Sequence, residues 1–216
     1  MTQEGGTGHG AVPAGHLRPL RLTIGKVGLP VADPLMLDMA NVPIGPDNRG
    51  LIGSELLSAY VVQIDPTHRT VSIFDPSTFR PQRGDVRLPL GLDGERRRFY
   101  LDAVLKVRPG LSVRRRLRID TGSEDSVDDP IVKQARRVTA TQLGNGLGSN
   151  FQGVSGVYDR IGIGPYRFNH VWGPGGDLPA IGMELLRRFT VTFDAPHHIL
   201  YLRPNAALSE PVPPPS

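Results

Sequence analysis

Apolar and polar residues alternate with a period of two along most of this chain, a pattern that predicts short β-strands joined by turns. The predicted strands are residues 20–24, 29–31, 35–39, 60–65, 70–74, 86–88, 99–107, a strand ending at 120, 138–143, 161–164, 166–168, 189–193 and 199–202. Short helices are predicted at 51–57, 131–137 and 181–186. The pattern therefore predicts an all-β fold with a few short helices.

One segment of this pattern occurs twice. Residues 52–65 align with residues 181–194 at an offset of 181 − 52 = 129, with identical Ile, Gly, Glu, Leu, Leu, Val and Asp positions. Upstream, Ile24-Gly25 matches Ile163-Gly164 at an offset of 163 − 24 = 139. An internal repeat of this kind predicts two related lobes. We expect a first lobe over residues 1–80, a second over 81–204 and a Pro-rich, disordered tail over 205–216, with the boundary in the connector 75–85.

The most informative stretch for function is the end of the predicted strand at Asp120. Leu117 and Ile119 alternate with Arg118, and the strand runs into Asp120-Thr121-Gly122-Ser123. Such an ending presents a carboxylate at the edge of a sheet, on a tight turn that glycine closes at low cost. About 60 residues later, Ala180-Ile181-Gly182 precedes a predicted helix and hairpin.

An Asp-Thr-Gly-Ser motif followed at this distance by apolar-apolar-Gly resembles one lobe of an aspartic protease of the pepsin and retropepsin type. With the repeat included, residues 16–204 resemble the two-lobed, bacterial retropepsin-like aspartyl proteases. The resemblance implies an acid-protease fold with two related lobes and the cleft between them. It also implies peptide-bond hydrolysis by a water that an aspartate activates, on a peptide or protein substrate and with no metal or organic cofactor.

The resemblance also implies roles for individual residues. Asp120 would be the catalytic aspartate, and Thr121 would reach across to its counterpart in the other active-site turn. Gly122 would permit the turn, and Ser123 would hydrogen-bond the outer carboxylate oxygen of Asp120. Four residues, Ile52, Gly53, Ile181 and Gly182, would pack behind the two active-site loops. Residues 144–150 stand where a flap hairpin is expected, and residues 1–15 where the flap of the first lobe is expected.

The sequence departs from the family pattern in one respect, because it contains a single Asp-Thr-Gly. Projecting Asp120 back by the two offsets gives 120 − 129 = −9 and 120 − 139 = −19, both of which precede Met1. Three interpretations follow: a native chain that starts further upstream, a homodimer in which each chain gives one Asp120, or a silent homologue that binds peptides without cutting them.

The chain carries a formal net charge of +4, and all its positive side chains except Lys26, Lys106 and Lys133 are arginines. Two short runs stand out, at residues 96–98 and 114–116. They are typical either of a phosphate-binding patch or of solvated strand ends and turns. We favour the second interpretation, and expect no nucleic acid partner, because no aromatic residues interleave with these runs as a base-stacking platform requires.

Other candidate chemistry is weak. Glu124, Asp125, Asp128 and Asp129 form an acidic run, for which we prefer a helix start at Asp129-Pro130 to a Ca²⁺ loop or a local dyad with Asp120. His197-His198 suggests a metal site, but a solvent-exposed hairpin turn is the better interpretation. With no cysteine in the chain, disulfides and thiolate chemistry are excluded.

The sequence leaves the compartment open. Residues 1–10 contain no apolar segment, so they do not predict a signal peptide, and no apolar run is long enough for a membrane span. The family resemblance implies export, so a periplasmic or secreted location would require an upstream start.

Overall fold

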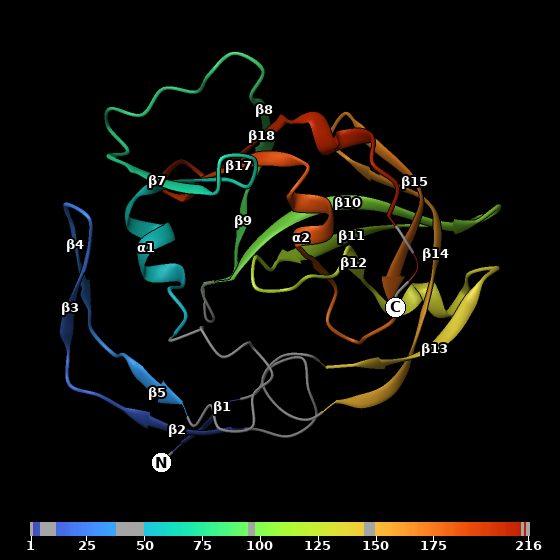
Figure 1. Cartoon of the computed structure of the whole chain (residues 1–216), viewed down its shortest axis with the longest axis horizontal. Helices are drawn as coiled ribbons and strands as arrows, with labels where there is room; N and C mark the ends of the chain where they lie inside the picture. The colour runs from blue at the N-terminus through green and yellow to red at the C-terminus, as the bar shows by residue number, and fades with distance from the viewer. Residues whose placement is uncertain are drawn as a thin grey trace.

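The computed structural model describes residues 2–4, 12–37, 50–94, 98–144, 150–212 and 214. It is all-β, with curled sheets and five short helical segments in this part of the chain (Figure 1). Those segments are α1 (Ser54–Ala59), η1 (Pro130–Gln134), α2 (Met183–Leu186), η2 (Ala195–His197) and η3 (Ala206–Ser209). The predicted all-β class is confirmed.

The described strands form four sheets, and the largest holds the second predicted lobe. That sheet contains β9 (Gly91–Leu92), β10 (Phe99–Arg108), β11 (Leu111–Ile119), β12 (Val127–Asp128), β13 (Val138–Leu143), β14 (Phe151–Ile163), β15 (Tyr166–Pro174) and β16 (Ala180–Ile181). The strand β14 is longer than predicted: residues 151–160 lack clear alternation because Gly153, Ser155 and Gly156 interrupt the pattern.

The N-terminal strands repeat part of this sheet, the pairing of β13, β14 and β15, with the same registers. They are β1 (Thr2–Glu4), β2 (Val12–His16), β3 (Leu20–Ile24), β4 (Val27–Val31) and β5 (Leu35–Leu37). The hairpin β1–β2 pairs Thr2 with Ala14, which at the offset of 139 corresponds to the pair Thr141–Gly153 in β13–β14. The hairpin β3–β4 likewise repeats β14–β15, with a left-handed glycine in each turn, Gly25 and Gly164.

A five-stranded sheet joins the two repeats (Figure 1). Its order is β7 (Thr70–Phe74), β6 (Val61–Asp65), β17 (Phe189–Asp194), β18 (Ile199–Pro204) and β8 (Val86–Pro89). At its centre Gln63 lies opposite Thr192, and Gln63 Nε2 donates to Thr192 Oγ1 at 3.0 Å. These residues are 129 apart, so each repeat pairs with its own equivalent around a pseudo-twofold axis at this point.

The symmetry extends to the hairpin turns. His68 Nδ1 lies 2.9 Å from Asp65 Oδ2, and at the equivalent turn His197 Nδ1 lies 2.6 Å from Asp194 Oδ1. The residue after each histidine, Arg69 and His198, has a left-handed backbone, with φ values of 53° and 57°. His197 thus belongs to a hairpin turn, in agreement with the preferred interpretation.

Apolar packing is uneven between the two repeats. The larger core lies in the second lobe and includes Leu105, Leu117 and Leu185. Among the described residues, the smaller core buries Leu29, Leu56 and Val62, with a few half-buried neighbours around them. The first repeat therefore depends more on the shared five-stranded sheet for its position.

Some local predictions need correction, and others fall outside the described residues. The C-terminal segment is not a disordered tail throughout: η3 forms, Asn205 caps it, and Leu208 and Val212 pack on the larger core. The helix predicted at 131–137 is a five-residue 3₁₀ helix, η1. Residues 38–49, 95–97 and 145–149, which include part of the expected flap and of the first arginine run, lie outside the described residues.

Candidate active site at the Asp120 loop

Asp120 stands where β11 ends against β16. The two strands pair in parallel, with Arg118 opposite Ala180 and Ile119 opposite Ile181. The backbone N–H of Asp120 donates to the carbonyl oxygen of Ile181 at 2.9 Å. The apolar-Gly element that follows 60 residues later thus fixes the backbone on which the carboxylate is carried.

Gly182 packs directly against the loop that carries Asp120. Its N–H donates to Ser126 O at 2.9 Å, and the next N–H, of Met183, donates to Ser123 O at 2.7 Å. A Cβ at Gly182 would stand 2.5 Å from the carbonyl oxygen of Asp125 and 2.8 Å from that of Ser123. Its φ of −112° suits any residue, so the close approach of backbone requires the glycine here.

Two contacts orient the carboxylate of Asp120. Arg118 Nη2 donates to Oδ2 at 2.7 Å, and the N–H of Gly122 donates to Oδ1 at 3.1 Å. Arg118 and Asp120 keep 17% and 30% of their side-chain surfaces exposed, so the ion pair is partly shielded from water but reachable. Sequence reasoning gave Arg118 no role, although residues i and i+2 of a strand share a face.

The other residues of the motif differ in part from their implied roles. Ser123 Oγ does not bond Asp120: it donates to Asp125 Oδ2 at 3.2 Å and accepts the N–H of Asp125 at 3.2 Å. Gly122 does not use the left-handed region, but its Cβ position is 3.4 Å from Asp120 Oδ1, so the carboxylate approaches it closely. Thr121 is exposed, and its hydroxyl forms no hydrogen bond with the described residues.

The acidic run after the motif divides into groups with different environments. Asp129 is fully buried, pairs with Arg115 Nε at 2.7 Å and caps η1 through the N–H of Ile131, as the preferred helix-start interpretation predicts. Burial, reinforced by the charges of Asp125 and Asp129, raises the pKa of Asp128 to about 7, against the opposing effect of a bond from the Gly176 N–H.

Asp125 lies nearer to the candidate site than Asp128. Desolvation by burial is the main cause that raises the pKa of Asp125. The hydrogen bond from the Ser123 hydroxyl opposes this rise, and the negative charges of Asp120 and Glu124 add to it. Within the described ranges no group of three acidic or histidine side chains is arranged to hold a metal ion.

The first-repeat copy of the apolar-Gly element has no such packing. Ile52 is 55% exposed, and a Cβ at Gly53 would meet, within 4 Å among the described residues, only Glu55 Oε2 at 3.7 Å. The structure thus brings Asp120 together with Ile181 and Gly182, and leaves Ile52 and Gly53 apart from any described active-site loop.

Comparison of the chain with protein-family models finds no match, and comparison with curated protein sequences finds none either. In the described part of the chain no helix has the length and apolar character needed to cross a membrane.

Proposed function

We propose that this protein is an aspartic-type peptidase with the acid-protease fold, in which Asp120 is one of two carboxylates that activate a water molecule. The observation that carries the proposal is the pairing of β16 with the end of β11, together with the packing of Gly182 against the Asp120 loop. This arrangement holds a carboxylate that is 30% exposed at the end of β11, where the Asp120 backbone is bonded to Ile181 of β16. Rigid placement of this kind is what positioning a water against a peptide carbonyl requires.

The chemistry requires a second carboxyl group. Two carboxylates in close contact cannot both ionise easily, so they share one proton. The ionised carboxylate takes a proton from water as the water oxygen attacks the peptide carbon. The protonated carboxyl donates its proton to the carbonyl oxygen. Collapse of the tetrahedral intermediate breaks the C–N bond as the nitrogen gains a proton. Two carboxyls and a water suffice, without a metal or an organic cofactor.

The pseudo-twofold axis at Gln63 and Thr192 supports a position for the second carboxyl. Applied to the Asp120 loop, the symmetry would place a matching loop against Ile52 and Gly53, which are exposed. Such a loop would come from a further segment of the native chain or from a second copy of this chain. Its Asp-Thr-Gly would then meet Thr121, whose hydroxyl has no hydrogen-bond partner among the described residues.

The experiment compares cleavage of an unfolded protein substrate at acid pH by the native protein and by two variants. Asp120→Asn removes the proposed base while keeping the side-chain shape, and we expect kcat/KM to fall roughly a thousandfold or more. Asp75→Asn makes the same change in an exposed turn and should leave activity unchanged. A statine-type inhibitor should block the wild-type activity.

Two results would overturn the peptidase proposal. One is cleavage that survives Asp120→Asn, and the other is equal loss in both variants. Activity that rises more steeply than the protein concentration would assign the second carboxyl to a second copy.

A second candidate is a peptide-binding homologue that does not cut. The ion pair between Arg118 and Asp120 favours it, because a guanidinium already occupies one oxygen of the carboxylate. This candidate requires that peptides bind without cleavage and that Asp120→Asn leaves the bound peptide intact, as in the wild type.

A further inference from the structure

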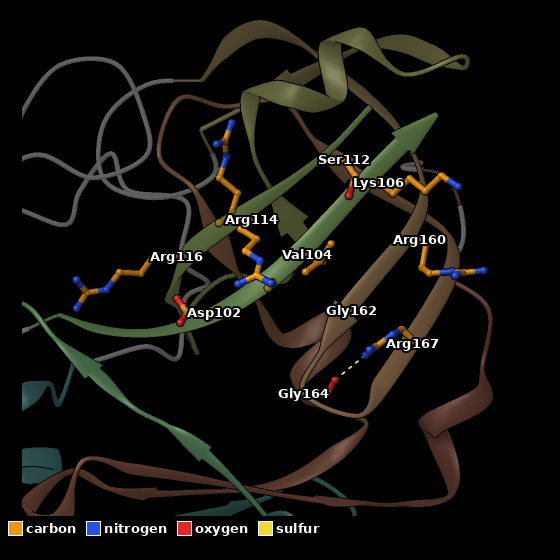
Figure 2. Close-up of a pocket in the computed structure, with 12 residues that line it drawn as sticks. Asp102, Val104, Lys106, Ser112, Arg114, Arg116, Arg160, Gly162, Gly164 and Arg167 are labelled. Carbon is orange, nitrogen blue, oxygen red and sulfur yellow. Dashed lines mark hydrogen bonds between the residues drawn. The ribbon is translucent and has the colours of Figure 1, made fainter. Parts of the chain in front are cut away.

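A concave, positively charged face covers the outer side of the large sheet. The second arginine run lies within β11, so the interpretation of this run as a solvated strand end or turn is wrong. Arg114 and Arg116 point to one face, which Lys106 of β10, Arg160 of β14 and Arg167 of β15 also line. We call these five residues the cationic face (Figure 2).

The register of the strands explains why this face is hollow. Arg114 lies opposite Val104, Val104 opposite Gly162, and Gly162 opposite Arg167, so one row crosses four strands. The two central positions are short, whereas an arginine stands at each end (Figure 2). In the next row Lys106 lies beside Arg160. The result is a depression of about 510 Å³ with a floor of small residues and a rim of cations.

The positive charge of the cationic face is not neutralised within the described part of the chain. No carboxylate there lies within 4.0 Å of any of the five cationic groups, and Asp102 is the single acid that lines the depression. The contacts that do exist orient the side chains without cancelling their charge. Arg167 Nη1 donates to the carbonyl oxygens of Gly164 and Tyr166, and Arg116 stacks over Tyr100 at 4.7 Å.

We propose that the cationic face binds a small anion that carries several phosphate groups. Planar guanidinium groups match phosphate oxygens with paired hydrogen bonds. The Cα atoms of Arg114 and Arg116, two positions apart on β11, stand about 7 Å apart, whereas those of Arg114 and Arg167, at the two ends of a row of four strands, stand about 14 Å apart. The depression lies in the middle of the sheet, where backbone groups already pair, so a peptide cannot add as a strand. Tyr100 lies beneath Arg116 and offers no free platform for a nucleic acid base. Recognition therefore depends on charge density.

The experiment is calorimetric titration of the whole protein with inorganic tripolyphosphate. The double variant Arg114→Gln/Arg167→Gln should weaken binding roughly tenfold or more for each arginine removed, since charge-assisted hydrogen bonds are lost. Arg18→Gln/Arg83→Gln removes the same net charge from exposed positions outside the depression and should change Kd by less than about twofold. Binding should weaken as salt is added.

Three results would overturn the inference. They are no binding of tripolyphosphate by the wild type, equal weakening in both double variants, and tighter binding of duplex DNA than of tripolyphosphate with the same arginine dependence. The last would make the face a nucleic-acid interface. Asp120→Asn should leave tripolyphosphate binding unchanged, so this test is independent of the peptidase proposal.

Discussion

The two copies of the Ile-Gly-x-Glu-Leu-Leu segment have nearly the same backbone conformation at their glycine but opposite surroundings. Gly53 and Gly182 have φ values of −113° and −112°, and each precedes a short helix. Gly182 is enclosed by the Asp120 loop, whereas Gly53 is exposed. In the helices, Leu185 and Leu186 are fully buried, whereas Leu57 of the first copy is only partly so. The two copies thus take up similar local structures, a glycine with nearly the same φ before a short helix, and among the described residues only the second is packed against a loop.

A second difference lies at the helix ends. Arg188 is completely buried, with its guanidinium bonded to Glu184 and to carbonyl oxygens of Ala207, Glu210 and Pro211. The equivalent position in the first copy is Ala59, 129 residues earlier. The second copy is therefore clamped from both sides, by the Asp120 loop and by the C-terminal segment. Among the described residues, the candidate site forms only at the second copy, the one packed on both sides.

The largest effect should come from breaking the Arg188 clamp. Arg188→Met keeps the volume but leaves buried oxygens without a donor, so we expect the free energy of unfolding to fall by about 3–5 kcal/mol. Arg187→Met removes a partly exposed ion-pairing group, 37% exposed, and should cost about 1 kcal/mol or less. Urea unfolding measures both, and equal losses would contradict the clamp.

The next effect tests the glycines themselves. Gly182→Ala places a methyl group against two carbonyl oxygens and should destabilise the protein by about 2–4 kcal/mol. Gly53→Ala makes the same change at the start of the other helix and should cost less than about 1 kcal/mol. Thermal unfolding of the two variants compares them directly. A loss of stability at Gly53 as large as that at Gly182 would mean that both glycines are enclosed in solution.

The third prediction concerns the pH dependence that Asp128 gives to the free energy of unfolding. Its pKa is raised by burial to about 7 in the folded state, so the folded protein binds the proton more tightly than the unfolded chain. The stability contributed by the protonated form is full below about pH 4 and is lost as pH rises through 7.

Asp128→Asn mimics the protonated form and tests this sign. The free energy of unfolding of the variant minus that of the wild type should rise by roughly 1–3 kcal/mol between pH 4.5 and pH 8. Urea unfolding at the two pH values measures the gain. A constant difference between variant and wild type would show that Asp128 does not titrate in this range.

The smallest effect lies on the pseudo-twofold axis, where the two repeats contribute equally. A double-mutant cycle of Gln63→Ala and Thr192→Ala should give a coupling of about 0.5–1.5 kcal/mol, because the single bond between their side chains is buried. A coupling indistinguishable from zero would show that this contact does not stabilise the shared sheet.

Local patterns determined much of what the sequence predicted. The strands, the two Ile-Gly hairpins and the Asp129-Pro130 start follow from period-two alternation and from turn and cap residues, which act within a few positions. The meeting of Asp120 with Ile181 was expected only through a family resemblance. Neither the Ser123–Asp125 bond nor the docking of Leu208 could be predicted, because each depends on which groups compete for a partner in the folded chain.

The cationic face shows the same limit over a longer distance. Alternation alone places Arg114 and Arg116 on one side of a strand. That Arg160 and Arg167 join them depends on the registers of β10 with β14 and of β14 with β15, and no local signal specifies these registers. The hollow between the arginines likewise needs Val104 and Gly162 to fall in one row.

The most direct test of the central claim is the mass of the species that carries peptidase activity, measured by light scattering across a size-exclusion separation of the native protein. The two-carboxylate mechanism predicts activity only in a species with two Asp-Thr-Gly loops, either one chain heavier than 23.5 kDa or an assembly of twice that mass. Activity in a single 23.5 kDa chain with one such loop would contradict the two-carboxylate mechanism. The absence of activity from every fraction would contradict the peptidase assignment itself.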